Sequence, residues 1–335
     1  MPGKSFEMTK KLREIFYRPE MAVLPFGTTP HHAMMFEKAG FEAFYMSGAM
    51  TAGWLLGWPD VGATTMREMA DNANRIAKTI NIPIFADIDT GYGTAVNVFR
   101  SIQEYIWAGV AGCHLEDQEF PKKSGSQAGR RLISIDEAVG KYRSAIAARN
   151  ELDPNFVICA RSDARGAEGG GFNEVLKRAK AYEEVGVDVI FFESLQSWEE
   201  CKTAMKSVNI PAFCLLHQVI FSDEAGNPRP GPSLKEQEEA GQAIALLPIA
   251  LGAAQQAAWE AILDFKEKGM EALHEFRVNQ QGKPPERLMP NLTSYQKVRD
   301  LEESFLPKEL QRDYENTLGA TPEGTLNRSD GTRMA

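Results

Sequence analysis

The stretch Ile82-Pro-Ile-Phe-Ala-Asp-Ile-Asp-Thr-Gly-Tyr-Gly93 combines a strand pattern with two carboxylates and a glycine turn. A short run of β-branched and aromatic residues that follows a proline is typical of a buried strand. Alternate residues of a strand share a face, so Asp87 and Asp89 point the same way at its carboxyl end. Two like charges on one face are tolerated when a cation lies between them or when they stay in water. The stretch therefore predicts either a metal site or a solvated loop start.

Strand-like runs of this kind recur along the chain and alternate with amphipathic segments. Alternation of strands and helices implies parallel strands joined by right-handed crossovers. Eight such runs spread over about 250 residues predict an α/β fold, a TIM (β/α)8 barrel, with a doubly wound parallel sheet as the alternative. The runs are Met21–Phe26, Phe41–Met46, Ile82–Asp89, Val110–Glu116, Phe156–Arg161, Val187–Glu193, Ile210–His217 and Ile244–Ile249.

The two ends of the chain lie outside this alternation. Apolar residues at helical spacing predict an N-terminal helix over residues 5–18. An alanine-rich helical stretch is expected from Leu251 to about Asn279, and its small residues allow close packing on the same subunit or on a partner. We therefore expect a barrel domain over 1–279. We expect a C-terminal extension over 280–335, with one helical piece near Ser294–Tyr314 and a disordered end.

Composition narrows the class of partner. The 335 residues carry a formal net charge of −9 at pH 7, which argues against nucleic acid or an anionic membrane as a partner. A small anionic substrate stays compatible, because local basic residues decide its binding. Four widely spaced cysteines form no CxxC pair and predict neither a disulfide framework nor a zinc site. No apolar run has the length of a membrane span or of a signal core, so we expect a cytoplasmic protein.

The expected strands end in polar or charged residues. A TIM barrel carries its active site at the carboxyl ends of its strands. Charged residues at four successive ends therefore indicate one acidic site that also holds an arginine. The ends, in chain order, are Tyr45-Met-Ser-Gly48, Asp87 with Asp89, Glu116, Arg161, Glu193 and His217.

Asp87, Asp89 and Glu116 form the candidate metal set. Oxygen-only ligands suit Mg²⁺ or Mn²⁺, and Mg²⁺ usually keeps several waters. Asp60, in the Gly57–Gly62 loop, is a fourth candidate, and a simple turn aspartate beside a proline is the other interpretation.

Arg161 is a cation at a strand end, where burial requires an anionic partner. A substrate carboxylate gripped by two guanidinium nitrogens would supply that partner. A structural ion pair with Glu193 or Asp163 is the alternative.

The loop Pro121-Lys-Lys-Ser-Gly-Ser-Gln-Ala-Gly-Arg130, named here the 121–130 loop, directly follows the acidic end of the fourth strand. A polar, basic, glycine-containing loop at this place is able to close over an anionic substrate and exclude water. A solvated surface loop is the other interpretation, and the position favours the lid.

These motifs together resemble the isocitrate lyase/phosphoenolpyruvate mutase superfamily. The similarity is greatest to the branch of 2-methylisocitrate lyases, dimethylmalate lyases, oxaloacetate decarboxylases and hydrolases, and carboxyphosphonoenolpyruvate mutases, and it covers about residues 10–275. The motifs are Tyr45-Met-Ser-Gly48, Asp87-Ile-Asp-Thr-Gly-Tyr-Gly93, His114-Leu-Glu-Asp-Gln118, Pro121-Lys-Lys-Ser-Gly125 and Ala160-Arg-Ser-Asp-Ala164.

The resemblance implies a Mg²⁺-dependent barrel that acts on small 2-oxo or 2-hydroxy acids through an enolate. By analogy, Asp87 would be the direct metal ligand, while Asp60, Asp89 and Glu116 would act mostly through water. Members of the family often form homotetramers that exchange the last barrel helix, which the alanine-rich segment would suit. The substrate would be held by Tyr45, Ser47, Gly48, Arg161 and Glu193, and Lys122 would belong to the gating loop.

The sequence departs from the lyase pattern in this loop. Ser124 stands where the lyases carry a cysteine that acts as acid or base, and Ser126 stands where they carry a histidine. A serine hydroxyl is a far weaker acid than a thiol, whose pKa is about 8.5. The segment 213–219 and the insert Ser222–Ser233 also differ from the pattern and suggest an unusual substrate.

The sequence therefore predicts a Mg²⁺-dependent lyase that cleaves a carbon–carbon bond of a 2-hydroxy- or 2-oxo-dicarboxylate, by aldol-type cleavage or by decarboxylation. Decarboxylation would tolerate Ser124 better, because carbon dioxide departs without a proton. A phosphonate-handling mutase or hydrolase of the same superfamily is one alternative, and a non-catalytic barrel that binds dicarboxylates is another.

Overall fold

The computed structural model describes residues 2–216, 219, 221, 222, 225–280, 295–321, 326, 327, 333 and 334. The chain forms two compact units, Met1–Ala254 and Gln255–Ala335. The predicted domain boundary at residue 279 stays a prediction, and His217, at the expected end of the seventh strand, lies outside the described residues. Within the described part of the chain, every helix is too short or too polar to cross a membrane.

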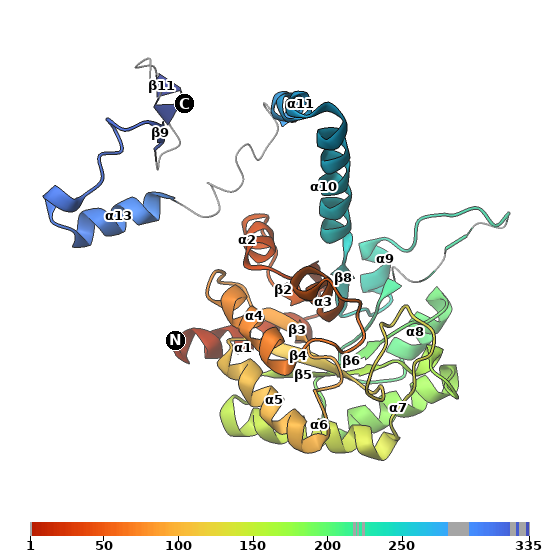
Figure 1. The fold of residues 1–335 in the computed structure, drawn as a ribbon. Coiled ribbons are helices and arrows are strands. Elements are labelled where there is room, and N and C mark those ends of the chain that lie inside the picture. Colours follow the sequence, from red (N-terminus) through yellow and green to blue (C-terminus); the bar gives the residue numbers. More distant parts are fainter. Residues whose placement is uncertain are drawn as a thin grey trace. The chain divides into compact units, whose positions relative to one another are not determined.

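The first unit is a barrel of eight parallel strands (Figure 1). Their order is β7-β6-β5-β4-β3-β2-β1-β8, so each strand pairs with its neighbours in sequence, and β8 returns to β1. The Ala243 amide donates to the Ala212 carbonyl at 3.0 Å and joins the last strand to β7. This order confirms the predicted TIM barrel over a doubly wound sheet. The strands are β1 (Ala22–Gly27), β2 (Phe44–Met46), β3 (Ile84–Asp87), β4 (Gly112–Glu116), β5 (Val157–Ser162), β6 (Val189–Phe192), β7 (Ala212–Cys214) and β8 (Ile244–Leu247).

Helices follow the strands, and most of them begin at a capping residue. Ser47 accepts a hydrogen bond from the Met50 amide, and Thr65 forms a capping box with Glu68. The first of these caps starts a helix directly at the end of β2. The helices are α1 (Pro2–Tyr17), α2 (Pro30–Lys38), α3 (Gly48–Leu56), α4 (Met66–Ala77), α5 (Ala95–Trp107), α6 (Ile135–Leu152), α7 (Phe172–Val185), α8 (Trp198–Met205) and α9 (Leu234–Glu239).

Strand alternation sorts the core into two clusters. Ile84 and Ala86 of β3 pack in the cluster that includes the surrounding helices, whereas Phe85 packs in the barrel interior. Helix α1 fills part of that interior, because Phe16 meets Phe85 edge-on with ring centroids 5.2 Å apart. Asp87 lies two residues after Phe85, on the same face of β3 and nearer its carboxyl end. The apolar interior therefore ends below a layer of polar groups.

The C-terminal helices differ from the sequence-based expectation in one respect. The single helix expected from Leu251 to Asn279 is two helices, α10 (Ile249–Lys268) and α11 (Met270–Gln280). Gly269 separates them at φ +59°, a left-handed conformation that ends a helix. The expected C-terminal helical piece is α13 (Tyr295–Phe305), followed by a short 3₁₀ turn at Lys308–Leu310. Much of the tail expected to be disordered lies outside the described residues, apart from the short pairs β9 (Gly319–Ala320), β10 (Leu326–Asn327) and β11 (Arg333–Met334).

Candidate active site

Asp87 is anchored at the end of β3 by two backbone amides. Its Oδ2 accepts from the Gly48 N–H at 3.1 Å, and its Oδ1 accepts from the Asp89 N–H at 2.9 Å. A Cβ at position 48 would lie 2.6 Å from Oδ2, so the amide approaches this closely only because the residue is glycine. Burial opposes ionisation of Asp87, but His114, Lys122 and Arg161 favour the anion, and its pKa lies below the ordinary value. Asp87 is therefore an anion near neutral pH.

Lys122 lies among the other predicted acids. Its Nζ is 2.7 Å from Asp89 Oδ1, contacts Asp60, and lies 3.9 Å from Glu116 Oε1. The side chain is completely buried, and burial alone would lower its pKa. The surrounding carboxylates raise that pKa well above the ordinary value instead, so the ammonium stays charged. The protein thus places its own cation among three of the four acids that the sequence singled out.

Burial disfavours the ionised form of two of these acids. It raises the pKa of Glu116 well above the ordinary value and raises that of Asp89 as well, although Lys122 opposes both shifts. Glu116 Oε2 and Asp89 Oδ1 are buried. Among the described residues, their partners are the charged groups of Arg161 and Lys122, respectively. In the same part of the chain, no three Asp, Glu, His or Cys side chains are grouped closely enough to hold a metal ion directly.

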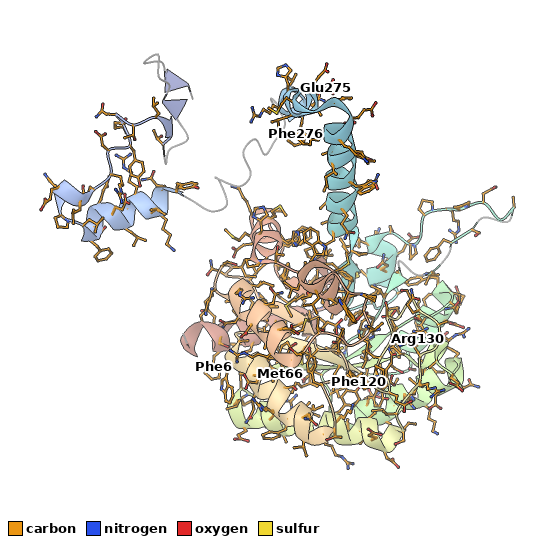
Figure 2. All side chains as sticks on the ribbon, in the orientation of Figure 1. Phe6, Met66, Phe120, Arg130, Glu275 and Phe276 are labelled. Carbon is orange, nitrogen blue, oxygen red and sulfur yellow. The ribbon has the colours of Figure 1, made fainter. Side chains whose placement is uncertain are left out.

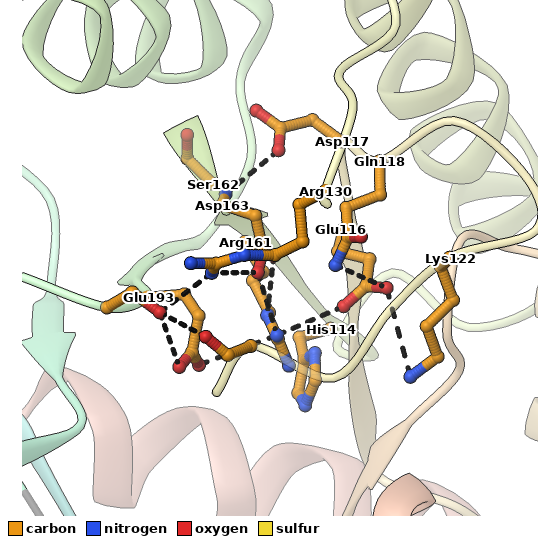
Figure 3. A network of polar contacts seen from close by, with 12 residues as sticks. His114, Glu116, Asp117, Gln118, Lys122, Arg130, Arg161, Ser162, Asp163 and Glu193 are labelled. Carbon is orange, nitrogen blue, oxygen red and sulfur yellow. Dashed lines mark hydrogen bonds and ion pairs between the residues drawn. The ribbon is translucent and has the colours of Figure 1, made fainter. Parts of the chain in front are cut away.

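Arg161 forms the opposite side of this network (Figure 3). Its Nη2 is 3.2 Å from Glu116 Oε2 and 3.5 Å from Glu193 Oε2. Its Nε donates to Asp163 at 2.9 Å, and the guanidinium carbon lies 5.2 Å from the centre of the Phe191 ring. The structural ion pairs that the sequence left as an alternative are therefore both present. They orient the arginine towards the acidic cluster, where a substrate anion would be a further partner.

Tyr45 and His114 form a neutral pair beneath Asp87. The Tyr45 hydroxyl is 2.8 Å from His114 Nε2, and His114 Nδ1 is 3.9 Å from Asp87 Oδ1. Burial lowers the pKa of His114 to about 4 and raises that of Tyr45 well above its ordinary value. The phenol therefore donates to Nε2, and the imidazole proton on Nδ1 faces Asp87. His114 was not among the predicted site residues, and its spacing from Glu116 on one strand face could have indicated this place.

The predicted substrate residues Ser47 and Gly48 lie beside Asp87, where β2 meets β3. In this structure their polar groups already have partners, because Gly48 donates to Asp87 and the Ser47 hydroxyl caps α3. The amino end of α3 therefore faces the acidic site, and its partial positive charge favours anions there.

The 121–130 loop lies against the site. Gln118 holds its start, since Gln118 Nε2 donates to Glu116 Oε1 at 3.2 Å and to the Lys123 carbonyl at 2.8 Å. A Cβ at Gly125 would lie 2.5 Å from Glu193 Cδ, so the loop backbone lies directly on that carboxylate. Phe120 precedes the loop and Arg130 ends it (Figure 2). The burial of Lys122 and Gly125 favours a lid over a fully solvated loop.

Residues of the first unit line two cavities, of which one belongs to the site. One cavity, of about 540 Å³, lies at the mouth of the site, between the Gly57–Gly62 loop and the 121–130 loop. Its lining residues are Pro59, Asp60, Val61, Lys123, Ser124, Gln127 and Ala128. Ser124 therefore faces the entrance, with its Oγ 3.2 Å from Ser126 Oγ. A larger cavity of about 630 Å³ is lined by residues of α1, α4 and α5, among them Phe6 and Trp107, and it touches none of the acidic residues.

The fold and the site together define a class, a (β/α)8-barrel enzyme with an acidic pocket under a lysine-bearing loop. Residues 12–264 match the family model described as phosphoenolpyruvate phosphomutase, and the chain belongs to this family. Both the predicted superfamily and the prediction of an enzyme of its lyase branch are confirmed.

Similar proteins are known by name and by structure. The 2,3-dimethylmalate lyase of Eubacterium barkeri is 42% identical over 244 residues, which are 72% of this chain and 79% of that protein. Oxaloacetate acetylhydrolase, solved with the inhibitor 3,3-difluorooxalacetate, is 30% identical with a TM-score of 0.76, covering 89% of this chain and 97% of that one. Phosphonopyruvate hydrolase, solved with oxalate and Mg²⁺, is 27% identical with a TM-score of 0.76, covering 90% and 99%.

Proposed function

We propose that the protein is a Mg²⁺-dependent lyase that cleaves a carbon–carbon bond of a 2-hydroxy- or 2-oxo-dicarboxylate through an enolate. The observation that carries this proposal is the cluster of Asp60, Asp87, Asp89 and Glu116 at one end of the barrel, bounded by Arg161. Two of the relatives are named after dimethylmalate and oxaloacetate, and both compounds are dicarboxylates of this class.

The residues present fit a magnesium ion. Mg²⁺ takes oxygen ligands, keeps several waters and usually binds through one or two carboxylates. Asp87 is ionised and fixed by two amides, so it would serve as the direct ligand. Asp60, Asp89 and Glu116 would hold metal-bound waters, and Mn²⁺ would fit the same oxygen ligands. The solved relative with oxalate and Mg²⁺ supports this choice. When bound, the ion would stabilise negative charge on the enolate oxygen.

The chain's own groups would bind and orient the substrate. Arg161 is aligned by Asp163 and Glu193 and would grip the carboxylate next to the oxo or hydroxyl carbon. The amino end of α3 would face the same anion, and Tyr45 would line the floor. The 121–130 loop would exclude water, which strengthens each of these electrostatic contacts.

Ser124 bears on the type of cleavage. Its hydroxyl lies in the cavity at the entrance, which Asp60 also lines, and it is a weak acid compared with a thiol. Decarboxylation needs no proton at the departing carbon, so this loop suits loss of carbon dioxide better than aldol-type cleavage.

We also propose a homotetramer. Trp259, Ile262 and Leu263 lie at i, i+3 and i+4 on α10, and 57%, 59% and 44% of their surfaces are exposed. An apolar stripe of this size on a helix is typical of a surface that packs against another subunit.

A substrate panel tests the reaction. Oxaloacetate, methylisocitrate, dimethylmalate and phosphonopyruvate are incubated with the enzyme with and without Mg²⁺, and products are followed by mass spectrometry. We expect turnover of at least one carboxylic acid, only with the metal. Turnover of phosphonopyruvate alone would favour a phosphonate enzyme, and tight oxalate binding without turnover of any compound would favour a binding protein.

A further inference from the structure

We propose that Ser194 is a positioning residue whose hydroxyl holds the 121–130 loop closed over the site at two points. This inference rests on the proposed function in one respect, since it takes the loop to be the cover of the active site. Ser194 directly follows Glu193 at the carboxyl end of β6, and only 4% of its surface is exposed.

One hydroxyl contacts two distant points of the loop. Ser194 Oγ donates to the Gly125 carbonyl in the middle of the loop, and it accepts from Arg130 Nη1, at the loop's end, at 2.7 Å. A hydroxyl carries one proton and two lone pairs, so it makes both bonds at once. Alanine or glycine at this position would make neither bond, so the hydroxyl is what joins the middle of the loop to its end.

The same contacts reach the arginine of the site. Arg130 Nη1 also donates to Asp163 Oδ1 at 3.2 Å, and Asp163 accepts from Arg161 at 2.9 and 3.1 Å (Figure 3). Arg130 is buried, and a Cβ at Gly166 would collide with its guanidinium. The end of the loop is therefore packed into the network that orients Arg161.

The backbone at Ser194 supports a specific role for the side chain. Its φ is +59°, a left-handed conformation that is uncommon for residues other than glycine. The Gln196 side chain donates to the Ser194 carbonyl at 2.7 Å and helps to fix this conformation. Glycine would adopt the same backbone without strain, but it would lack the hydroxyl that binds the loop.

Gly125 lies in the Ser124–Gln127 turn, only three residues after Lys122, so its position restricts where Ser124 and Lys122 lie. When the bond from Ser194 to Gly125 is present, the backbone lies on the Glu193 carboxylate and Lys122 reaches Asp89. We infer that loss of the hydroxyl shifts the loop towards an open form in which Lys122 leaves the acids.

Native-state proteolysis tests this inference without substrate. Trypsin cleaves after Lys122 or Lys123 only when the loop opens, and its rate follows the open population when opening is fast. Ser194→Ala and Ser194→Gly in the full-length protein are expected to be cut in this loop about tenfold faster than the wild type, since each loses two buried hydrogen bonds. The Gly variant removes the hydroxyl while relieving backbone strain, so it remains informative if the Ala variant folds poorly.

Ser207→Ala is the matched control, because that hydroxyl bonds locally at the end of α8, to the Ala204 carbonyl at 2.7 Å. It is expected to be cut at the wild-type rate. Wild-type cleavage rates in both Ser194 variants would overturn the proposal. Fast cleavage of Ser194→Ala together with a wild-type rate in Ser194→Gly would also overturn it, because backbone strain rather than the lost hydroxyl would then explain the opening.

Kinetics separate this inference from the proposed function. On a substrate that the panel identifies, both Ser194 variants are expected to lose kcat while remaining folded at the assay temperature, as circular dichroism would show. A protein that turns over no substrate would refute the proposed function, and the proteolysis rates would still decide the role of Ser194.

Discussion

Lys122 is the residue on which the electrostatics of the site depend. Its ammonium lies among Asp60, Asp89 and Glu116, and burial of so many acids requires a cation. A divalent ion held near the same carboxylates would share this negative charge with the lysine. The ammonium and the metal would therefore compete for the same carboxylates, and each would bind more weakly in the presence of the other.

Removing the ammonium tests this relation. In Lys122→Met the carboxylates lose their internal cation, so we expect Mg²⁺ to bind the resting protein about tenfold more tightly, a change of about 1.4 kcal/mol. Isothermal titration calorimetry measures the affinity. Lys123→Met is the control, because the contacts of Lys123 to Gln118 use its backbone. Equal or weaker binding in Lys122→Met would show that the lysine does not compete with the metal.

At this scale the sequence predicted the acids and Arg161, because each follows directly on a strand-like run. It missed Arg130 and Ser194. Arg130 binds Asp163 and Ser194, which lie 33 and 64 residues further along the chain. Neither missed residue belongs to a local pattern, and only the closed barrel brings the end of β6 beside the loop that follows β4.

The 121–130 loop is the element that decides the chemistry, and its lack of a thiol is open to test. The four native cysteines are buried, and burial raises the pKa of Cys113, Cys159 and Cys214 well above the ordinary value. These thiols are therefore poor nucleophiles.

We expect no native thiol to react with Ellman's reagent in the folded protein, whereas Ser124→Cys adds one reactive thiol per chain. The same variant is expected to gain aldol-type cleavage of methylisocitrate or dimethylmalate, because a thiol at the entrance supplies the missing acid. Absorbance titration and product assays measure the two effects. An unreactive introduced thiol, or an unchanged product profile, would count against the assignment of this loop position.

Among the elements, strands were more predictable than helices. Each of the eight strand-like runs overlaps an observed strand, because a buried parallel strand is a continuous apolar run. Helix α3 was missed because its residues Gly48–Leu56 are apolar and nearly uniform, with no periodic polar face. The break at Gly269 was missed because one glycine does not interrupt the surrounding pattern.

At the scale of the whole molecule, we expect assembly through α10. Trp259→Glu places a charge in the exposed apolar stripe and is expected to reduce a tetramer to smaller species, because an unpaired charge resists burial. Size-exclusion chromatography with light scattering measures the mass. Ala257→Glu adds the same side chain on the opposite side of the helix and should leave the mass unchanged. A monomeric wild type would contradict the proposed homotetramer.

The barrel as a whole could be predicted because strand ends, strand count and turn residues agree with one another. The closed position of the loop could not be predicted, since it depends on Gly125 of the loop after β4 meeting Glu193 at the end of β6. The number and placement of subunits also depend on surfaces that no sequence pattern pairs.

The central claim is that Asp87 holds a magnesium ion which in turn helps to hold a 2-oxo acid. Calorimetric titration of oxalate, a dianion shaped like the enolate of pyruvate, tests it most directly, in wild type and Asp87→Asn, each with and without Mg²⁺. We expect the metal to tighten oxalate binding by about a hundredfold in the wild type, a change of about 2.7 kcal/mol, and to have little effect in Asp87→Asn. Metal-independent oxalate binding in the wild type, or a full metal effect in the variant, would contradict it.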